Sequence, residues 1–277
     1  MAASLCIILL GLWWTVGCLS TEPLKLSTPP MSAITVPGAI PYQICKTGPQ
    51  KHDELSPGIR NAFEDISAKN PSILIRYFDD QACEDYIEKN FDDRTLDAYR
   101  NIRAGAYRAD LFRYCFLFVD GGVYGDLTQT YHHPLSRFID FDNDDLVLVR
   151  DRSSFSFPPE LWPDASSGPH PPPVQVSFMA ARPRHPIFKH AIDQICHNVK
   201  TRSYGASPLY PTGPCLFGSI LRDHGFPYRC ELEESGGSLK FIQTGEVAIT
   251  TKSHDHKDQL LKRPSYTKLW LLRKAFA

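Results

Sequence analysis

The stretch RADLFRYCFLFVDGGVYGDLT, residues 108–128, decides the fold. Its first half places apolar side chains at the helical spacing i, i+3, i+4, i+7, on Leu111, Tyr114, Cys115 and Phe118. Gly121 and Gly122 follow, and glycine readily takes the left-handed conformation that ends a helix. The apolar letters VYGDL then predict a short strand. The stretch therefore predicts a helix, a glycine turn and a strand that carries Asp126 at its carboxyl end.

Strand and helix patterns alternate on both sides of this stretch. Apolar runs predict strands over 39–45, 72–78, 123–127, 144–151, 174–181, 239–243 and 246–250. Helical spacing and terminal signals predict helices over 56–71, 81–91, 185–199 and 211–225. We expect Thr212 to cap the last of these helices and Gly225 to end it. The alternation predicts an α/β fold whose mixed, mainly parallel sheet has helices on both faces.

The composition and the N-terminal segments indicate the class of protein. The 277 residues have a net charge of -1, with 42% hydrophobic and 22% charged residues, which is typical of a globular protein and gives no basic field for nucleic acid. Residues 4–20 carry no charge, and the run is shorter than the roughly 20 residues of a membrane-spanning helix. We expect 1–20 to be a cleaved signal peptide or a short signal anchor, 21–39 a flexible stem and 40–277 a single domain in the secretory pathway.

The cysteines and the absence of several catalytic motifs limit the possible classes of protein further. The six cysteines beyond the leader permit up to three disulfides in an oxidising compartment. For Cys115, on an apolar helix face, the alternative is a buried thiol. The sequence lacks the phosphate loop, the dinucleotide fingerprint, the zincin motif and the nucleophile elbow. These absences disfavour nucleoside triphosphatases, simple dehydrogenases, zinc proteases and serine hydrolases.

Asp110, Arg113 and Asp126 form the one constellation of polar residues that suggests chemistry. Asp110 and Arg113 are three residues apart, so they share one edge of the expected helix. The simplest interpretation is an intrahelical ion pair that contributes a few tenths of a kcal/mol. The functional interpretation is a sugar site, because a carboxylate accepts from neighbouring hydroxyls and a guanidinium presents donors in a fixed plane.

Residues 108–127 resemble the central motif of the family 32 glycosyltransferases, which runs Arg-Ala-Asp, Arg-Tyr and then Gly-Gly-Ile/Val-Tyr-x-Asp-x-Asp. This family of DXD-containing sugar transferases includes initiating mannosyltransferases. Weaker likenesses follow in the family's order and extend the resemblance over about 38–270, in the segments IPYQICKTGP, VSFMAARPRHPIF, TGP and SYTKLW. The resemblance implies a GT-A-like fold, a nucleotide-sugar donor, a glycan or glycolipid acceptor and a divalent metal, usually manganese.

The resemblance also implies roles for single residues. Asp110 and Arg113 would contact the donor sugar, and Asp126, the first acid of the DXD motif, would touch the ribose and the metal. Thr128 stands where the motif has its second acid, and a neutral hydroxyl is a poorer metal ligand. Late metal ligands could come from His254 and His256, for which an exposed polar loop is the alternative.

Three other segments take part in the expected site. Thr212, Gly213 and Pro214 resemble the acceptor-side loop of the family, and Cys45 aligns with an aromatic residue that stacks on the base in many relatives. The proline-rich loop 155–173, which contains Trp162, is expected to border the site as a lid. The amphipathic tail 266–276 is expected to close over the site or to lie on a membrane surface, and packing against the sheet is the simpler alternative.

The function that follows is transfer of a hexose from a GDP- or UDP-sugar to a glycan, glycolipid or protein-linked acceptor, with retention of configuration. No catalytic base or nucleophile is assigned. The alternative from another class is a non-catalytic relative that binds sugar or a partner and has lost the metal site at Thr128. A nucleotide-sugar hydrolase is a third interpretation. The sequence also suggests membrane association through the N-terminus.

Overall fold

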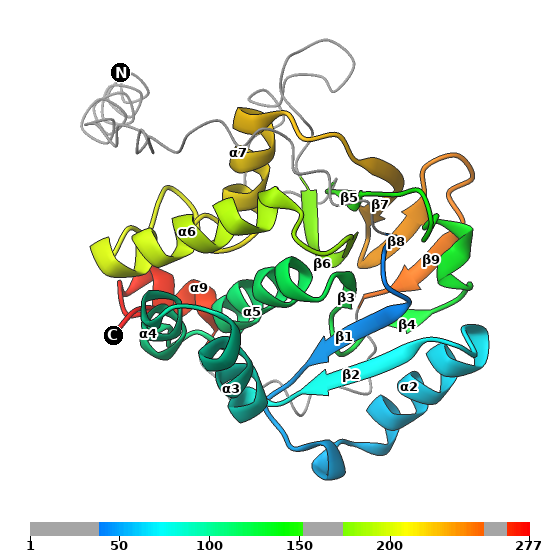
Figure 1. Cartoon of the computed structure of the whole chain (residues 1–277), viewed down its shortest axis with the longest axis horizontal. Coiled ribbons are helices and arrows are strands. Elements are labelled where there is room, and N and C mark those ends of the chain that lie inside the picture. Colours follow the sequence, from blue (N-terminus) through cyan, green and yellow to red (C-terminus); the bar gives the residue numbers. More distant parts are fainter. Residues whose placement is uncertain (1–38, 152–173, 252–264) are drawn as a thin grey trace, which may run out of the picture. The chain divides into compact units, whose positions relative to one another are not determined.

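A computed structural model of the chain describes residues 39–151, 174–251 and 265–277. Within these residues nine strands form one sheet, in the order β2-β1-β3-β6-β5-β7-β8-β9-β4 (Figure 1). The strands are β1 Gln43–Thr47, β2 Leu74–Phe78, β3 Gly122–Gly125, β4 Thr130–Tyr131, β5 Leu146–Asp151, β6 Val174–Ala181, β7 Arg229–Ser235, β8 Ser238–Phe241 and β9 Val247–Thr250. The leader 1–20 and almost all of the stem 21–39 lie outside the described residues.

Helices cover both faces of this sheet. They are α2 Pro57–Lys69, α3 Asp80–Asn90, α4 Asp93–Asn101, α5 Gly105–Val119, α6 Pro186–Thr201, α7 Pro214–His224 and α9 Tyr266–Leu271, with short 3-10 turns η1 His52–Glu54 and η2 Leu135–Arg137. Every predicted helix and strand is present within a few residues of its expected bounds. The elements that the sequence did not predict are α4, β4 and β7.

The pairing of the strands is mixed. β1 pairs in parallel with β2 and β3, and β5 pairs in parallel with β7. The pairs β3–β6, β5–β6, β7–β8, β8–β9 and β4–β9 are antiparallel. The predicted α/β class and mixed sheet are confirmed, but the parallel share is smaller than predicted, because β6 runs against its neighbours and β7–β9 form hairpins.

The sheet separates two apolar clusters, because neighbouring side chains on a strand point to opposite faces. On β1 and β3, Cys45 and Tyr124 join the cluster made with α5, α6 and α7. Ile44 and Val123, one position earlier on the same strands, join the cluster on the other face, where α2 contributes Ile66. Figure 1 shows α5 and α6 side by side over the first face. The predicted arrangement of helices on both faces is confirmed.

The glycine turn behaves as the sequence predicts. Asp120 ends α5, and Gly121 and Gly122 follow with φ of 65° and 92°. A Cβ atom at Gly122 would lie 2.6 Å from Cγ and 2.9 Å from the carbonyl oxygen of Gln43. Glycine is therefore required there both for the backbone conformation and for the close approach of β1.

One helix cap differs from the prediction. α7 ends at Gly225 in the left-handed conformation, as expected, but its N-cap is Gly213, which makes no side-chain cap bond. The hydroxyl of Thr212 bonds elsewhere, to the carboxylate of Asp110. The buried carboxylate of Asp110 is a charged acceptor, so its bond to the hydroxyl is stronger than a bond to a neutral group.

The tail packs on the helical face of the fold. Trp270 donates its indole N–H to the carbonyl of Tyr204 at 2.7 Å, and Phe276 is buried beside a bridge to Ile102. This is the simplest of the three arrangements considered for residues 266–276, although its partners are helices and a loop and not the sheet itself. No helix among the described residues is long and apolar enough to span a membrane.

All six cysteines of the folded part are free thiols, so the disulfides that their number permits are not formed among the described residues. Cys115 is buried in the helical cluster, as its apolar helix face predicts. Burial raises the pKa of its thiol well above the ordinary value.

His185 offers a pH test of the fold. It caps α6, accepts from the amide of Ile187, and is buried; burial, with a smaller contribution from Arg182, lowers its pKa from 6.5 to about 4. Below pH 6.5 the unfolded chain binds a proton that the folded chain does not, so the free energy of unfolding falls as the pH falls toward 4.

His185→Asn keeps an oxygen that can cap the helix but removes the titration. Between pH 7 and pH 5 the wild type should lose about 2 kcal/mol relative to His185→Asn, measured by denaturant unfolding at each pH. If the difference in the free energy of unfolding between the two proteins is the same at pH 7 and pH 5, then His185 takes up its proton in the folded chain as readily as in the unfolded chain, which would contradict the prediction.

Candidate functional site

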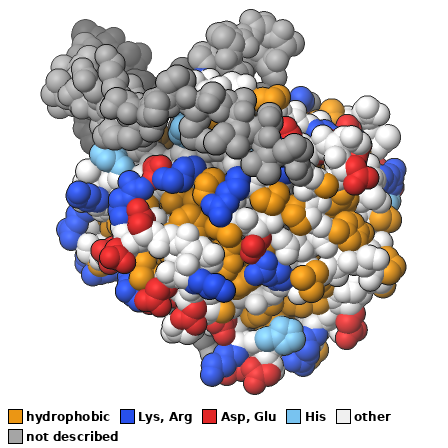
Figure 2. All heavy atoms as spheres, viewed as in Figure 1, with side chains coloured by type: hydrophobic (Ala, Val, Ile, Leu, Met, Phe, Trp, Pro, Cys, Tyr) orange, Lys and Arg blue, Asp and Glu red, His pale blue; other side chains and the backbone are white. Residues whose placement is uncertain are grey.

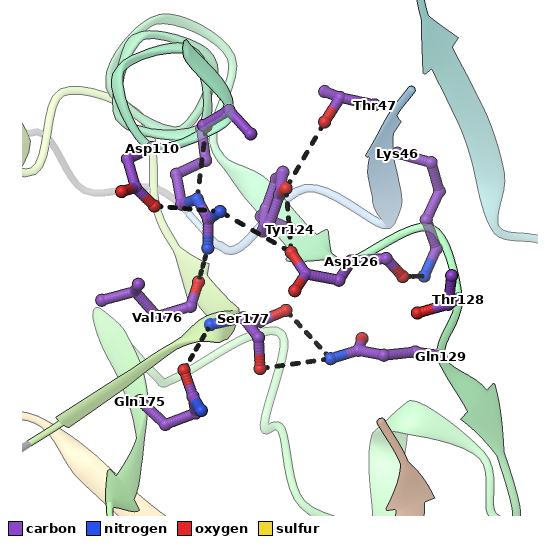
Figure 3. A network of polar contacts seen from close by, with 12 residues as sticks. Lys46, Thr47, Asp110, Tyr124, Asp126, Thr128, Gln129, Gln175, Val176 and Ser177 are labelled. Carbon is purple, nitrogen blue, oxygen red and sulfur yellow. Dashed lines mark hydrogen bonds and ion pairs between the residues drawn. The ribbon is translucent and has the colours of Figure 1, made fainter. Parts of the chain in front are cut away.

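Asp110, Arg113 and Asp126 meet at one point, as predicted (Figure 3). One guanidinium nitrogen of Arg113 lies 3.1 Å from a carboxylate oxygen of Asp110 and 3.6 Å from one of Asp126. The guanidinium also lies over the ring of Tyr124, 4.3 Å from its centroid, and donates to the carbonyl of Val176. The intrahelical ion pair exists, but it is buried and shared with a second carboxylate from the end of β3.

Burial controls the charges of this group. Arg113 is 5% exposed and Asp110 is 7% exposed. Burial raises the pKa of Asp110, whereas the charge of Arg113 and the hydroxyl of Thr212, at 2.7 Å, act to lower it. Removing one partner from such a group leaves an uncompensated buried charge, so each member depends on the others.

Asp126 is the member that faces solvent. Its side chain is 42% exposed. One carboxylate oxygen accepts from the hydroxyl of Tyr124 at 3.1 Å, and the amide of Asp126 donates to the carbonyl of Ser177 at 3.0 Å. The fold thus fixes one side of the carboxylate and leaves capacity for a ligand, because an ionised carboxylate accepts several hydrogen bonds.

A divalent metal is typical of the DXD motif, and the described residues can be tested for it. A cation such as Mg²⁺ is held by one or two carboxylates together with substrate phosphates and water. Here Thr128 donates its hydroxyl to the carbonyl of Thr251 at 3.2 Å, which leaves Asp126 as the one motif carboxylate. No group of three His, Cys, Asp or Glu side chains that could hold a metal occurs in the described part of the chain. Among the described residues Asp126 is therefore the one motif carboxylate that could hold such a cation, and phosphates of a donor and water would have to supply most of the other ligands.

The remaining predicted residues divide between the site and other places. Thr212 is fully buried and supports Asp110, so its side chain acts inside the fold, while Gly213 and Pro214 begin α7 next to it. Cys45 is buried in the helical cluster and presents no surface to a base. His254 and His256, and the loop 155–173 with Trp162, lie outside the described residues.

Lys46 belongs to the site although the sequence did not point to it. It is 2% exposed, and its ammonium donates to the carbonyl of Asp126 and to the hydroxyl of Tyr131, both at 3.0 Å. Burial lowers the pKa of Lys46 to about 7, and the charge of Asp126 opposes this shift. A lysine at a strand end normally reaches solvent, so no sequence signal predicts this burial.

The structure also has an open groove of ≈ 580 Å³ at the edge of the sheet. It lies between η1, α2 and β2, and its lining residues are His52, Phe63, Glu64, Ser67, Ile75 and Tyr77. None of the predicted site residues lines it, so this groove is separate from the meeting point of Asp110, Arg113 and Asp126.

Comparison with known proteins agrees with the resemblance seen in the sequence. Residues 57–144 match the family described as a glycosyltransferase sugar-binding region containing a DXD motif, and this span holds Asp110, Arg113 and Asp126. No curated protein matches the chain. Among solved structures, the PaToxG glycosyltransferase is similar, with 16% identity over 68% of this chain and 71% of that chain and a TM-score of 0.46. Residues 57–144 are therefore similar to the sugar-binding region of DXD-containing glycosyltransferases.

Thr212→Val tests the support of Asp110. The change keeps the shape of the side chain but removes the buried hydroxyl, so we expect a loss of about 2 kcal/mol in the free energy of unfolding. Thr201→Val is the matched control, because the Thr201 hydroxyl bonds the carbonyl of His197 at the exposed end of α6. Equal losses in the two variants, measured by denaturant unfolding, would contradict a special role for Thr212.

Proposed function

We propose that the protein is a hexosyltransferase that uses a UDP- or GDP-linked sugar. The observation that carries the proposal is the exposed carboxylate of Asp126, held by the buried Arg113 inside a region that matches the sugar-binding region of glycosyltransferases. The acceptor would be a glycan, a glycolipid or a protein-linked sugar. Retention of configuration is part of the proposal through the family resemblance.

Each of the three polar residues has a defined part in this function. Asp126 accepts hydrogen bonds from hydroxyls of the donor on its solvent side. Asp110 keeps lone pairs beyond those used by Arg113 and Thr212, and it accepts from the transferred sugar. Arg113 holds both carboxylates in place and supplies a fixed positive charge. Catalysis then rests on positioning and on preorganised charge.

The resemblance also suggests manganese as the cofactor. Asp126 is the residue that would ligate it, with Thr128, His254 and His256 as the other sequence candidates. The described residues offer Asp126 as the one motif carboxylate for such an ion, and no step of the proposed function is assigned to a metal.

A second candidate function is a non-catalytic relative that binds sugar or a partner. The observation that favours it is Thr128, whose hydroxyl is engaged with Thr251 at the place of the second motif acid. The transferase and a relative that binds the donor sugar both predict donor binding, and turnover separates these two; a relative that binds only a partner predicts neither.

We further propose that the protein acts in the secretory pathway, in the lumen of the Golgi or the endoplasmic reticulum or after secretion. This rests on the uncharged run at 4–20, which would also provide membrane association if it is retained. Protease protection of the chain in isolated microsomes tests it, and digestion without detergent would contradict it.

A panel of nucleotide sugars tests the function. A ligand that binds the folded state alone raises the melting temperature, so a UDP- or GDP-hexose should raise that of the wild type. Asp126→Asn should abolish the shift and lower donor turnover by about 100-fold, as expected for loss of a charged contact at the reacting group. Asp142→Asn, at an exposed acidic position of the 140–145 turn, should change neither.

The outcomes separate the candidates. Binding with turnover supports the transferase, and binding without turnover for any acceptor supports the non-catalytic relative. Failure of every common nucleotide sugar to bind the folded protein, with or without manganese, would refute the transferase and a donor-binding relative.

A further inference from the structure

A buried polar cluster lies beneath the turn that carries Asp126, and the proposed function does not use it. Its members are Lys46 at the end of β1, Gln129 in the turn, Tyr131 in β4 and Ser177 in β6. All four side chains are at least nine-tenths buried. Figure 3 shows Lys46 and Ser177 approaching the turn from different strands.

The cluster is a continuous set of hydrogen bonds. Lys46 donates to the carbonyl of Asp126 and to Tyr131, each at 3.0 Å, and Tyr131 donates to the amide oxygen of Gln129 at 2.9 Å. The side-chain amide nitrogen of Gln129 donates to the carbonyl of Ser177 at 3.0 Å.

The same cluster holds both peptide groups of Asp126. The main-chain amide of Asp126 donates to the carbonyl of Ser177 at 3.0 Å. The carbonyl of Asp126 accepts from the ammonium of Lys46 and, at 3.2 Å, from the main-chain amide of Gln129. Because both the amide and the carbonyl of Asp126 are hydrogen-bonded, the backbone fixes the direction in which the Asp126 side chain points.

Gly125 makes room for the cluster. A Cβ atom at this position would lie 2.1 Å from the hydroxyl oxygen of Tyr131, 2.8 Å from the amide oxygen of Gln129 and 3.0 Å from the ammonium nitrogen of Lys46. The glycine before Asp126 is thus explained by the polar groups packed against it.

The charge of Lys46 makes this arrangement unusual. A buried charge is costly unless it is paired and hydrogen-bonded. Among the described residues no ion pair to Lys46 exists; its ammonium has oxygen acceptors and the ring of Tyr131, with the centroid at 4.6 Å. With a pKa lowered to about 7 by burial, the amine is only partly protonated at neutral pH, but it donates hydrogen bonds in either form. A side chain needed for packing alone could be apolar at this site, so the buried amine points to a task at the turn.

We propose that Lys46 is a positioning residue that holds the 126–129 turn from inside the fold and so sets the direction of the Asp126 carboxylate. In this chain Thr128 stands in place of the second acid of the motif, so a metal ion could not fix Asp126 by joining two motif carboxylates. The effect on donor binding rests on the proposed function, whereas the effect on the turn does not.

The turn itself can be measured by amide hydrogen exchange on the free protein. Lys46→Met keeps most of the length of the side chain, which is one atom shorter, and removes the hydrogen bond to the carbonyl of Asp126. We expect exchange in the peptide that covers 122–131 to rise by about tenfold, the effect of losing one hydrogen bond to a charged group. Lys46→Gln, which retains a side-chain NH2 donor group, should give a smaller rise.

Arg76→Met is the matched control. Arg76 is also a cation on a strand beside β1, and it pairs with Asp120 at 2.6 Å, at the other end of β3 from the turn. Its loss should not raise exchange in 122–131. The proposal is overturned if the two variants exchange alike in this peptide, or if Lys46→Met exchanges as the wild type does.

Donor affinity gives the second readout. Lys46→Met should raise the dissociation constant and the KM of the bound UDP- or GDP-hexose by about tenfold, in protein shown by circular dichroism to be fully folded. Arg76→Met should leave both constants unchanged. A purely structural Lys46 would lower the melting temperature without changing either constant, and that result would overturn the proposal.

Gly125→Ala perturbs the cluster and leaves Lys46 itself in the chain, although the added Cβ would lie 3.0 Å from its ammonium nitrogen. Because the added methyl group collides with Tyr131, it should raise exchange in 122–131 as Lys46→Met does. Gly218→Ala in α7, where a Cβ meets nothing within 4 Å, should not. If the wild type binds no nucleotide sugar, the proposed function fails, and the exchange comparison still decides the role of Lys46 at the turn.

Discussion

The guanidinium of Arg113 is the contact on which the site depends. It joins three elements: it pairs with Asp110 on its own helix, reaches Asp126 beyond the end of β3, and donates to the main chain of β6 at Val176. A buried arginine requires partners of this kind, because an unpaired charge in the interior costs several kcal/mol. The same bonds that satisfy the guanidinium therefore bring a helix edge and a strand end together and place one carboxylate at the surface.

The site has an inner and an outer part with different tasks. In the inner part Arg113, Lys46, Asp110 and Thr212 are buried and bonded to one another or to the main chain. In the outer part the carboxylate of Asp126 keeps one face for a ligand. Preorganised groups of this kind act without reorganisation when charge develops, which suits the proposed transfer from a nucleotide sugar. Thr128 stands in the place of the second motif acid, and Arg113 and Lys46 are cations that the described residues place against Asp126.

Local patterns predicted much of this fold, and contacts between distant residues account for what was missed. One stretch of the chain contains the helical spacing of α5, the glycine pair and Asp126 at the strand end, and all three features were predicted. The bond from Thr212 to Asp110 spans 102 residues, and no local pattern encodes it. The burial of Lys46 follows from Tyr131 and Gly125, which close the space around it. β7 was missed because its sequence RCELEES is rich in glutamate, which is uncommon in strands.

The most direct test of the account is a crystal structure of the protein with a bound UDP- or GDP-hexose. The account predicts that the donor lies against the exposed oxygen of Asp126, with a sugar hydroxyl within hydrogen-bond distance of Asp110, and with Arg113 still bridging the two carboxylates. A donor bound in the groove between α2 and β2, or anywhere else away from Asp126, would contradict it.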